Sequence, residues 1–328
     1  MKTCKPLIVG IPAALLLSGY FLIAPSYAFL QDHTPETKTE DFRISTNVDL
    51  VLLDVSVKDS KGGYVSNLTK ENFTIEENGV PQKIATFLGK DVPVSAGLVL
   101  DASGSMRNKR QDVNTAGLAF VNASNPQDQI FVVDFNDKVR SGLPDDVAFT
   151  DDVPLLRQAL NKHPTEGRTA LYDAIASALK HLDAGTRDKK TLLVVSDGGD
   201  NASRLSGAET MRLIEESHAT IYTIGLFDPD DVDRNPGVLR RIAAVSGGEC
   251  FLLDKVEDIV PTGRRIAQDI RKRYTIGYIP DRGNGKLTGL RKVHVTALAP
   301  DHGKLIVRTR ASYIDSRLAA QSKLVAKN

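Results

Sequence analysis

The chain has 328 residues and a formal net charge of +1 at pH 7, and 41% of its residues are hydrophobic and 25% charged. This length allows one large domain or two modest ones, each with its own core. The chain has no Trp and no strong basic excess, which argues against a nucleic-acid binder or a membrane-surface binder.

Residues 1–28 have the pattern of a signal peptide for export. Lys2 and Lys5 precede a mostly apolar stretch, and Ser26 and Ala28 are small residues suited to a cleavage site after Ala28. The alternative is an uncleaved anchor, since an apolar segment of about 20 residues can span a bilayer. We expect cleavage, which would leave a periplasmic, cell-surface or secreted mature chain without a membrane span.

An N-terminal β segment is predicted at 45–92, after a polar linker at 29–44. Its apolar residues alternate as in strands with one buried face, and Asn78-Gly79 is a hairpin-type dipeptide. The predicted strands cover 48–57, 73–77 and 82–87. So few short strands form too small a core to be stable alone.

Between 93 and 273 short apolar strands alternate with amphipathic helices. The strands are predicted at 94–100, 129–133, 191–195, 220–224 and 250–253. The helices are predicted around 116–121 and at 153–162, 170–182, 208–217, 238–245 and 256–273. This alternation predicts an α/β domain with a Rossmann-like, doubly wound, mostly parallel sheet covered by helices on both faces. Because ligands bind such sheets at the carboxyl ends of the strands, a functional site is expected just after the apolar runs.

A second β segment is predicted at 274–314, followed by a polar tail at 315–328. Its strands are expected at 274–279, 291–298 and 304–309. We expect the two β segments to pack together as one β-sandwich-like module of about seven strands, with the α/β domain inserted between them. The alternative is two separate flaps that lie on the α/β domain.

Polar residues follow two of the apolar strands and precede one of the helices. Asp101, Ser103 and Ser105 form the pattern Asp-x-Ser-x-Ser after the strand at 94–100. By itself this pattern also fits a turn and a helix N-cap. Thr169 stands at the start of a long helix, however, and Asp197 follows another buried strand. If the sheet is doubly wound, all these positions lie on one rim.

Together these residues would supply two carboxylates and three hydroxyls, without histidine or cysteine. Oxygen ligands suit a hard cation, and a low ligand charge with room for water favours Mg²⁺ or Mn²⁺ over Ca²⁺. With few acids around it, the metal keeps enough positive charge to attract a carboxylate from outside. We therefore expect a protein partner that presents an Asp or Glu side chain.

The same positions resemble the metal-ion-dependent adhesion site of von Willebrand factor A domains, over about residues 93–273. The resemblance implies that the two serines and the threonine reach the metal directly, and that one or both aspartates act through water. The flanks are similar to those of bacterial exported proteins with von Willebrand factor A-related domains. That similarity rests on 57–59, 68–73, 77–79, 274–278 and 308–313. Together the resemblances imply an exported, metal-dependent adhesion or interaction module.

An enzyme is the main alternative to a binding module. A Mg²⁺-dependent phosphatase also has an aspartate after a parallel strand, but it needs a second acid two residues further on, where this chain has Ser103. The sequence has neither the serine elbow of hydrolases nor a phosphate-binding Gly-rich loop, and we predict no catalytic activity. A metal-free structural scaffold with the same fold is a further alternative. The acidic segment 228–233 is predicted to be a solvated loop, since Val232 stands where a calcium loop needs an oxygen ligand.

Overall fold

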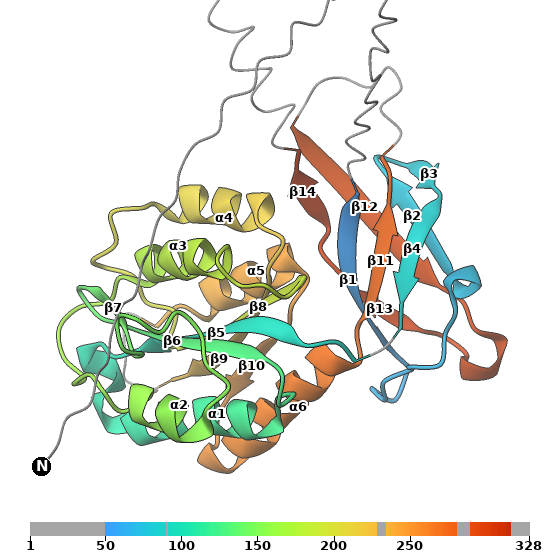
Figure 1. Cartoon of the computed structure of the whole chain (residues 1–328). Coiled ribbons are helices and arrows are strands. Elements are labelled where there is room, and N and C mark those ends of the chain that lie inside the picture. Colours follow the sequence, from blue (N-terminus) through green and yellow to red (C-terminus); the bar gives the residue numbers. More distant parts are fainter. Residues whose placement is uncertain (1–49, 90, 228–233, 281–288, 316–328) are drawn as a thin grey trace, which may run out of the picture. The chain divides into compact units, whose positions relative to one another are not determined.

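The computed structural model describes residues 50–89, 91–227, 234–280 and 289–315, which all belong to one compact unit (Figure 1). The predicted signal peptide (1–28), linker (29–44) and acidic loop (228–233) lie outside the described residues, as does the predicted polar tail after Asp315. Within the described ranges, no helix is long and apolar enough to cross a membrane.

The central sheet has six strands and is parallel except at one edge (Figure 1). Its order is β10 (Cys250–Leu253), β9 (Thr220–Leu226), β8 (Lys189–Ser196), β5 (Val94–Asp101), β6 (Gln129–Phe135) and β7 (Val139–Ser141). Every residue of β5 is buried, which explains why its sequence is an almost continuous apolar run. The chain continues from β5 to β6 on one side and later to β8 on the other, so the strand order reverses at β5.

Among the described residues, six α-helices cover the two faces of this sheet. They are α1 (Arg110–Ala123), α2 (Val153–Ala159), α3 (Leu171–Leu182), α4 (Gly207–Glu216), α5 (Pro236–Ser246) and α6 (Ile259–Arg271). Figure 1 shows α3, α4 and α5 on one face, with α1, α2 and α6 on the other. The sheet and its helices form the α/β domain, and its doubly wound arrangement is the predicted one.

The flanking segments form two four-stranded antiparallel sheets. One has the order β13-β1-β11-β4 and the other β14-β12-β2-β3. The strands are β1 (Val51–Lys58), β2 (Phe73–Glu77), β3 (Val80–Gln82), β4 (Ile84–Leu88), β11 (Tyr274–Tyr278), β12 (Leu290–Ala297), β13 (Ile306–Arg308) and β14 (Ser312–Ile314). Each sheet combines strands from both flanks, because β1 pairs with β11 and β2 pairs with β12. We call these two sheets the sandwich, and the predicted fold class is confirmed.

The sandwich has a hydrophobic core of its own, separate from that of the α/β domain. Both sheets contribute to it, for example Leu53 and Ile276 from one and Ile75 and Val295 from the other. Tyr274 packs edge-on against an aromatic neighbour in the second sheet, with ring centroids 5.1 Å apart. Neither segment supplies this core alone, which agrees with the expectation that each is too small to be stable by itself.

The strand predicted at 82–87 is wrong in its extent, because this stretch holds the end of β3 and most of β4. Asn78 and Gly79 have positive φ values of 52° and 80° and turn the chain into β3, as a tight hairpin requires. Pro81 lies in β3 at the edge of its sheet, where its missing N–H is tolerated. The chain then crosses to the other sheet, where β4 pairs with β11.

Three further differences concern short or terminal segments. The strands β7 and β14 were not predicted, because three residues are too few to show a period. The helix predicted at 153–162 ends at Ala159. The helix predicted at 256–273 begins as a 3₁₀ turn at Val256–Asp258 before α6.

A buried ionic network joins α6 to strand β1 of the sandwich. Asp269 is fully buried and accepts hydrogen bonds from Ser56 Oγ at 2.7 Å and from Tyr222 OH. Arg273 donates to Asp269 Oδ2 from both Nε and Nη2, each at 3.1 Å. Lys58 Nζ lies 4.0 Å from Asp269 Oδ1. These contacts connect the last helix of the α/β domain to the first strand of the sandwich.

Candidate metal centre

Asp101 is the last residue of β5, and its side chain is fully buried at the point where the strand order reverses. Oδ1 accepts a hydrogen bond from Ser103 N at 2.9 Å, and Oδ2 accepts one from Ser196 Oγ at 2.6 Å. Burial and the negative charge of nearby Asp197 raise the pKa of Asp101 to about 7, although the hydrogen bonds oppose this shift. Two acids therefore repel each other at this end of the sheet.

The two serines of the Asp-x-Ser-x-Ser pattern lie at the start of a short 3₁₀ helix, Gly104–Lys109, that leads into α1. Ser103 Oγ lies 3.1 Å from Ser105 Oγ. Ser105 Oγ in turn donates to Asp197 Oδ2 at 2.7 Å. Ser103 is buried and Ser105 is exposed, so this pair of hydroxyls leads from the interior to the surface.

Asp197 directly follows β8, the neighbour of β5 in the sheet. Its Oδ1 accepts from Gly199 N at 2.9 Å, and its backbone carbonyl accepts from Asn235 N at 2.9 Å. Gly198 has a φ of +82°, and a Cβ there would lie 2.3 Å from the carbonyl oxygen of Asn235. Only glycine fits this close turn, which holds the Asp197 carboxylate toward Ser105.

Thr169 lies in the loop before α3 and is buried. Its N–H donates to Asn201 Oδ1 at 2.9 Å, and its carbonyl accepts from Asn201 N at 2.9 Å. Gly104 N donates to Gly167 O at 2.9 Å. The loop of Thr169 is thus bonded both to the segment after β8 and to the serine-bearing segment after β5.

The structure therefore brings the five residues predicted from the sequence to one rim. Asp101, Ser103, Ser105 and Asp197 form a hydrogen-bonded series, and backbone bonds place the loop of Thr169 beside it. The carboxyl ends of β5 and β8 make this rim, as expected for a doubly wound sheet. We call this set of residues the rim site.

Supporting residues of the rim site were missed at the sequence level. Ser196 Oγ bonds Asp101, and it also accepts from Gly198 N at 3.0 Å. The side chain of Asn201 fixes the backbone of the Thr169 loop. Both residues lie close to Asp197 in the sequence. Their hydrogen-bond partners depend on the conformation of the loop at 196–201, however, and no residue spacing predicts that conformation.

All donors at the rim site are oxygen atoms. Across the part of the chain that the structure describes, no group of three or more His, Cys, Asp or Glu side chains could hold a metal ion. The rim site differs from such groups because three of its five side chains bear hydroxyl groups. A set of two carboxylates and three hydroxyls has the donor chemistry that Mg²⁺ and Mn²⁺ prefer.

Residues 97–199 match the family model of the von Willebrand factor type A domain. This stretch contains all five residues of the rim site, most of β5 and the whole of β6, β7 and β8. The central domain therefore has a von Willebrand factor A-like α/β fold. A comparison with curated proteins gave no match.

Solved structures with a similar fold come from several sources. An aerotolerance-related membrane protein from Bacteroides fragilis is 15% identical, with 55% of this chain and 99% of that one covered and a TM-score of 0.45. A von Willebrand factor type A protein from Catenulispora acidiphila is 15% identical, with 83% and 76% covered and a TM-score of 0.49. The proximal thread matrix protein 1 of the mussel byssus, with zinc in its MIDAS motif, is 17% identical, with 58% and 48% covered and a TM-score of 0.47.

Proposed function

We propose that this chain is an exported protein-binding module whose rim site holds one divalent metal ion. The observation that carries the proposal is the series of oxygen donors from buried Asp101 through Ser103 and Ser105 to Asp197. It connects the ends of two adjacent parallel strands and reaches the surface at Ser105. Such a site suits recognition of a ligand that approaches from outside.

The residues that would hold the ion are Asp101, Ser103, Ser105, Thr169 and Asp197. The small number of acids favours Mg²⁺ or Mn²⁺ over Ca²⁺, which takes more oxygen ligands. A bound cation would also relieve the repulsion between the two aspartates that disfavours ionisation of Asp101. The ion supplies a Lewis-acidic centre that a further oxygen ligand can join.

The partner is proposed to be a protein that presents an Asp or Glu carboxylate. Two carboxylates only balance the charge of a divalent ion, and hydroxyls add none. The rim site then has no excess of negative charge that would repel one more anionic oxygen, which can join the ion as a ligand. We propose binding rather than turnover, so a phosphoester or acyl-ester hydrolysis that is lost in Asp101→Asn would contradict this part of the proposal.

Metal binding is tested by calorimetric titration of the purified mature chain with Mg²⁺ and Mn²⁺. We expect Asp101→Ala and Ser105→Ala to weaken binding at least tenfold, because each removes a donor of the rim site. Asp146→Ala, which removes an exposed acid from the loop after β7, is the matched control and should bind as the wild type does. Equal metal affinity in all four proteins would exclude the proposed ligands.

Partner binding and export need separate experiments on cells. An envelope extract is passed over the immobilised chain with magnesium or with a chelator, and wild type is compared with Asp101→Ala. We expect partners that are retained only with magnesium and only by the wild type. N-terminal sequencing of the envelope-associated chain should begin after Ala28, whereas an intact Met1 form confined to the cytosol would contradict export.

A further inference from the structure

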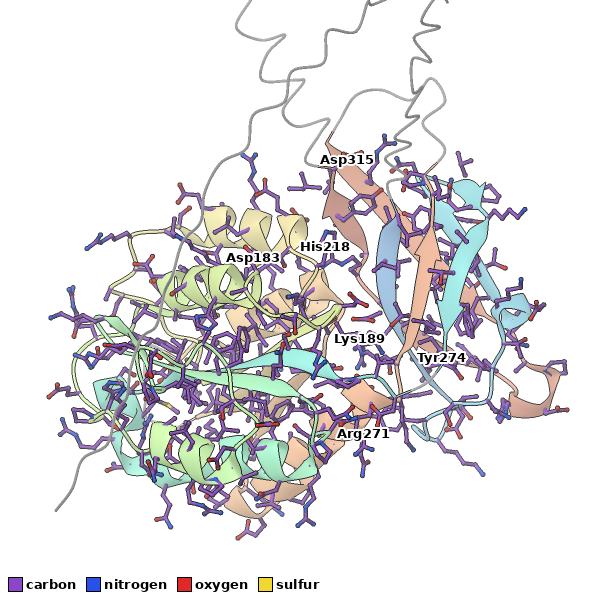
Figure 2. All side chains as sticks on the ribbon, viewed as in Figure 1. Asp183, Lys189, His218, Arg271, Tyr274 and Asp315 are labelled. Atoms are coloured by element: carbon purple, nitrogen blue, oxygen red, sulfur yellow. The ribbon has the colours of Figure 1, made fainter. Side chains whose placement is uncertain are left out.

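A cleft of about 600 Å³ lies between the sandwich and the end of the α/β domain that is remote from the rim site. One wall is the outer face of β1, β4 and β11, and the other is formed by the end of α3 and the start of β8. Figure 2 shows Asp183, Lys189 and His218, which line it, on the side of the α/β domain facing the sandwich. The eight-residue strand β8 separates Lys189 from the rim site, a distance of about 25 Å.

Aliphatic side chains lie on both walls of the cleft. Leu50, Leu52 and Leu88 of the sandwich remain 42%, 37% and 48% exposed, and all three line the cleft. Leu179 and Leu182 of α3 lie on the opposite wall. Single exposed leucines are common on protein surfaces, but three in one cleft form an apolar patch of the kind found at binding sites. No Phe or Tyr is among the described lining residues, so the wall suits an aliphatic ligand.

Lys189 provides a buried positive charge at the base of this cleft. It is only 5% exposed, and its Nζ donates to Arg273 O at 3.0 Å. An ammonium group can donate three hydrogen bonds. No carboxylate of the described residues lies within 4.0 Å of this group, although the charge of Asp54, which also lines the cleft, acts to raise its pKa. Burial accordingly lowers the pKa of Lys189, and such a charge gains from an anionic partner.

The other charged residues of the cleft narrow the choice of ligand. Lys190 Nζ is already held by the carbonyls of Leu182 and Gly185. Arg187 donates from Nη2 to Gln127 O at 2.9 Å, while its Nε is buried with no partner among the described residues. The carboxylates of Asp54, Asp183 and Asp188 also line the cleft. They repel a dianion more strongly than a monoanion, so a ligand with a single negative charge fits the cleft better.

We propose that this cleft binds an amphipathic monocarboxylate, with the carboxylate on Lys189 Nζ and an unbranched aliphatic chain along Leu50, Leu52 and Leu88. Its volume lies within the range of about 300–1,000 Å³ found for small-molecule sites. The positive charge of Lys189 favours a negatively charged head group, and the three leucines favour an aliphatic tail. The site is independent of the rim site, because the two share no residue.

The test is calorimetric titration of the full mature chain with decanoate. Acetate has the same head group without the tail, and decyltrimethylammonium has the same tail with a positive head group. We expect decanoate to bind at least tenfold more tightly than either. Absence of decanoate binding, or equal binding of the cationic ligand, would overturn the proposal.

Variants then locate the ligand. Lys189→Met should lower the affinity for decanoate at least tenfold, whereas Arg271→Met, which removes one positive charge outside the cleft, should leave it unchanged. The double variant Leu52→Ser/Leu88→Ser changes only partly exposed side chains, so it tests the tail contacts even if Lys189→Met fails to fold. It should also bind decanoate at least tenfold more weakly. Wild-type affinity in the double variant, or lost binding in Asp101→Ala, would refute the assigned position.

Discussion

Two buried aspartates of the α/β domain have opposite pKa shifts because their neighbours differ. Asp101 lies beside Asp197, and burial together with this like charge raises its pKa to about 7. Burial also acts to raise the pKa of Asp269, but the charge of Arg273 and the hydrogen bonds from Tyr222 and Ser56 outweigh it and hold the pKa at about 2. A bound cation would therefore stabilise the charged form of Asp101, whereas Asp269 already has the positive charge of Arg273 beside it.

Asp269 should therefore contribute pH-dependent stability. A carboxyl group with a pKa of about 2 in the folded chain and 3.8 as the reference contributes about 2 kcal/mol above pH 4, and this is lost as the pH falls through 2. Asp269→Asn should destabilise the chain by roughly 3 kcal/mol at pH 7, because Arg273 is left buried without its counter-charge.

Urea unfolding of wild type and Asp269→Asn between pH 2 and pH 7 measures this difference. We expect the gap in unfolding free energy to be constant above pH 4 and to narrow below it. Asp146→Ala, with its exposed side chain, serves as a control that shows no such gap. A gap independent of pH would show that Asp269 does not titrate as described.

At the scale of single elements, capping residues determine where several helices begin and end. Ser206 and Glu209 form a reciprocal capping box at the start of α4. Asn235 caps the start of α5, and Gly247 in the left-handed conformation caps its end. These signals stand in the sequence, and the predicted bounds of both helices differ from the observed ones by only one or two residues.

Ser206→Ala should shorten or fray α4 and lower the unfolding free energy by about 1 kcal/mol. The hydroxyl accepts from Glu209 N and donates to Glu209 Oε2, and alanine removes both bonds. Ser217→Ala at the other end of α4 is the matched control, since that hydroxyl bonds only within the last turn and the following loop. Urea unfolding compares the variants, and equal stability of the two would contradict a capping role for Ser206.

Other elements could not be predicted from the sequence because they depend on distant partners. The apolar residues of 84–88 alternate as in a strand. Their place beside β11 is set by tertiary pairing, however, and the paired residues of the two strands are about 190 positions apart in the sequence. The rim site was predictable because parallel strands end on the same edge of the sheet. The cleft was not, since Leu52, Leu88 and Lys189 come from three separate strands and no spacing relates them.

On the scale of the whole molecule, the flanking segments depend on each other for their sheets. The strand β1 lies between β11 and β13, and β2 lies between β12 and β3. The partners of the N-terminal strands thus come largely from the C-terminal segment. By contrast, the α/β domain forms its sheet entirely from residues between β5 and β10.

The number of strands predicted from the sequence already indicated this dependence, because each flanking segment has too few strands to form a core of its own. What the sequence could not show is the set of ion pairs that join the sandwich to the α/β domain. Lys58 of β1 and Arg308 of β13 both bond Glu249, which lies just before β10. Charged residues at such separations carry no pairing signal in a single sequence, so this junction became visible only in the structure.

Deletion of 274–328 should therefore unfold the N-terminal segment 45–92, because β1 and β2 lose the strands that pair with them and cover their core. Their exposed edges would also favour aggregation. An isolated 93–273 chain should stay folded and bind Mg²⁺, since its sheet is complete and Arg273 still neutralises Asp269. Limited proteolysis of both truncated chains, with calorimetry on the second, provides the measurement. If 45–92 resists protease as well without 274–328 as with it, the two segments do not form one shared module and the proposed division at 92/93 and 273/274 is wrong.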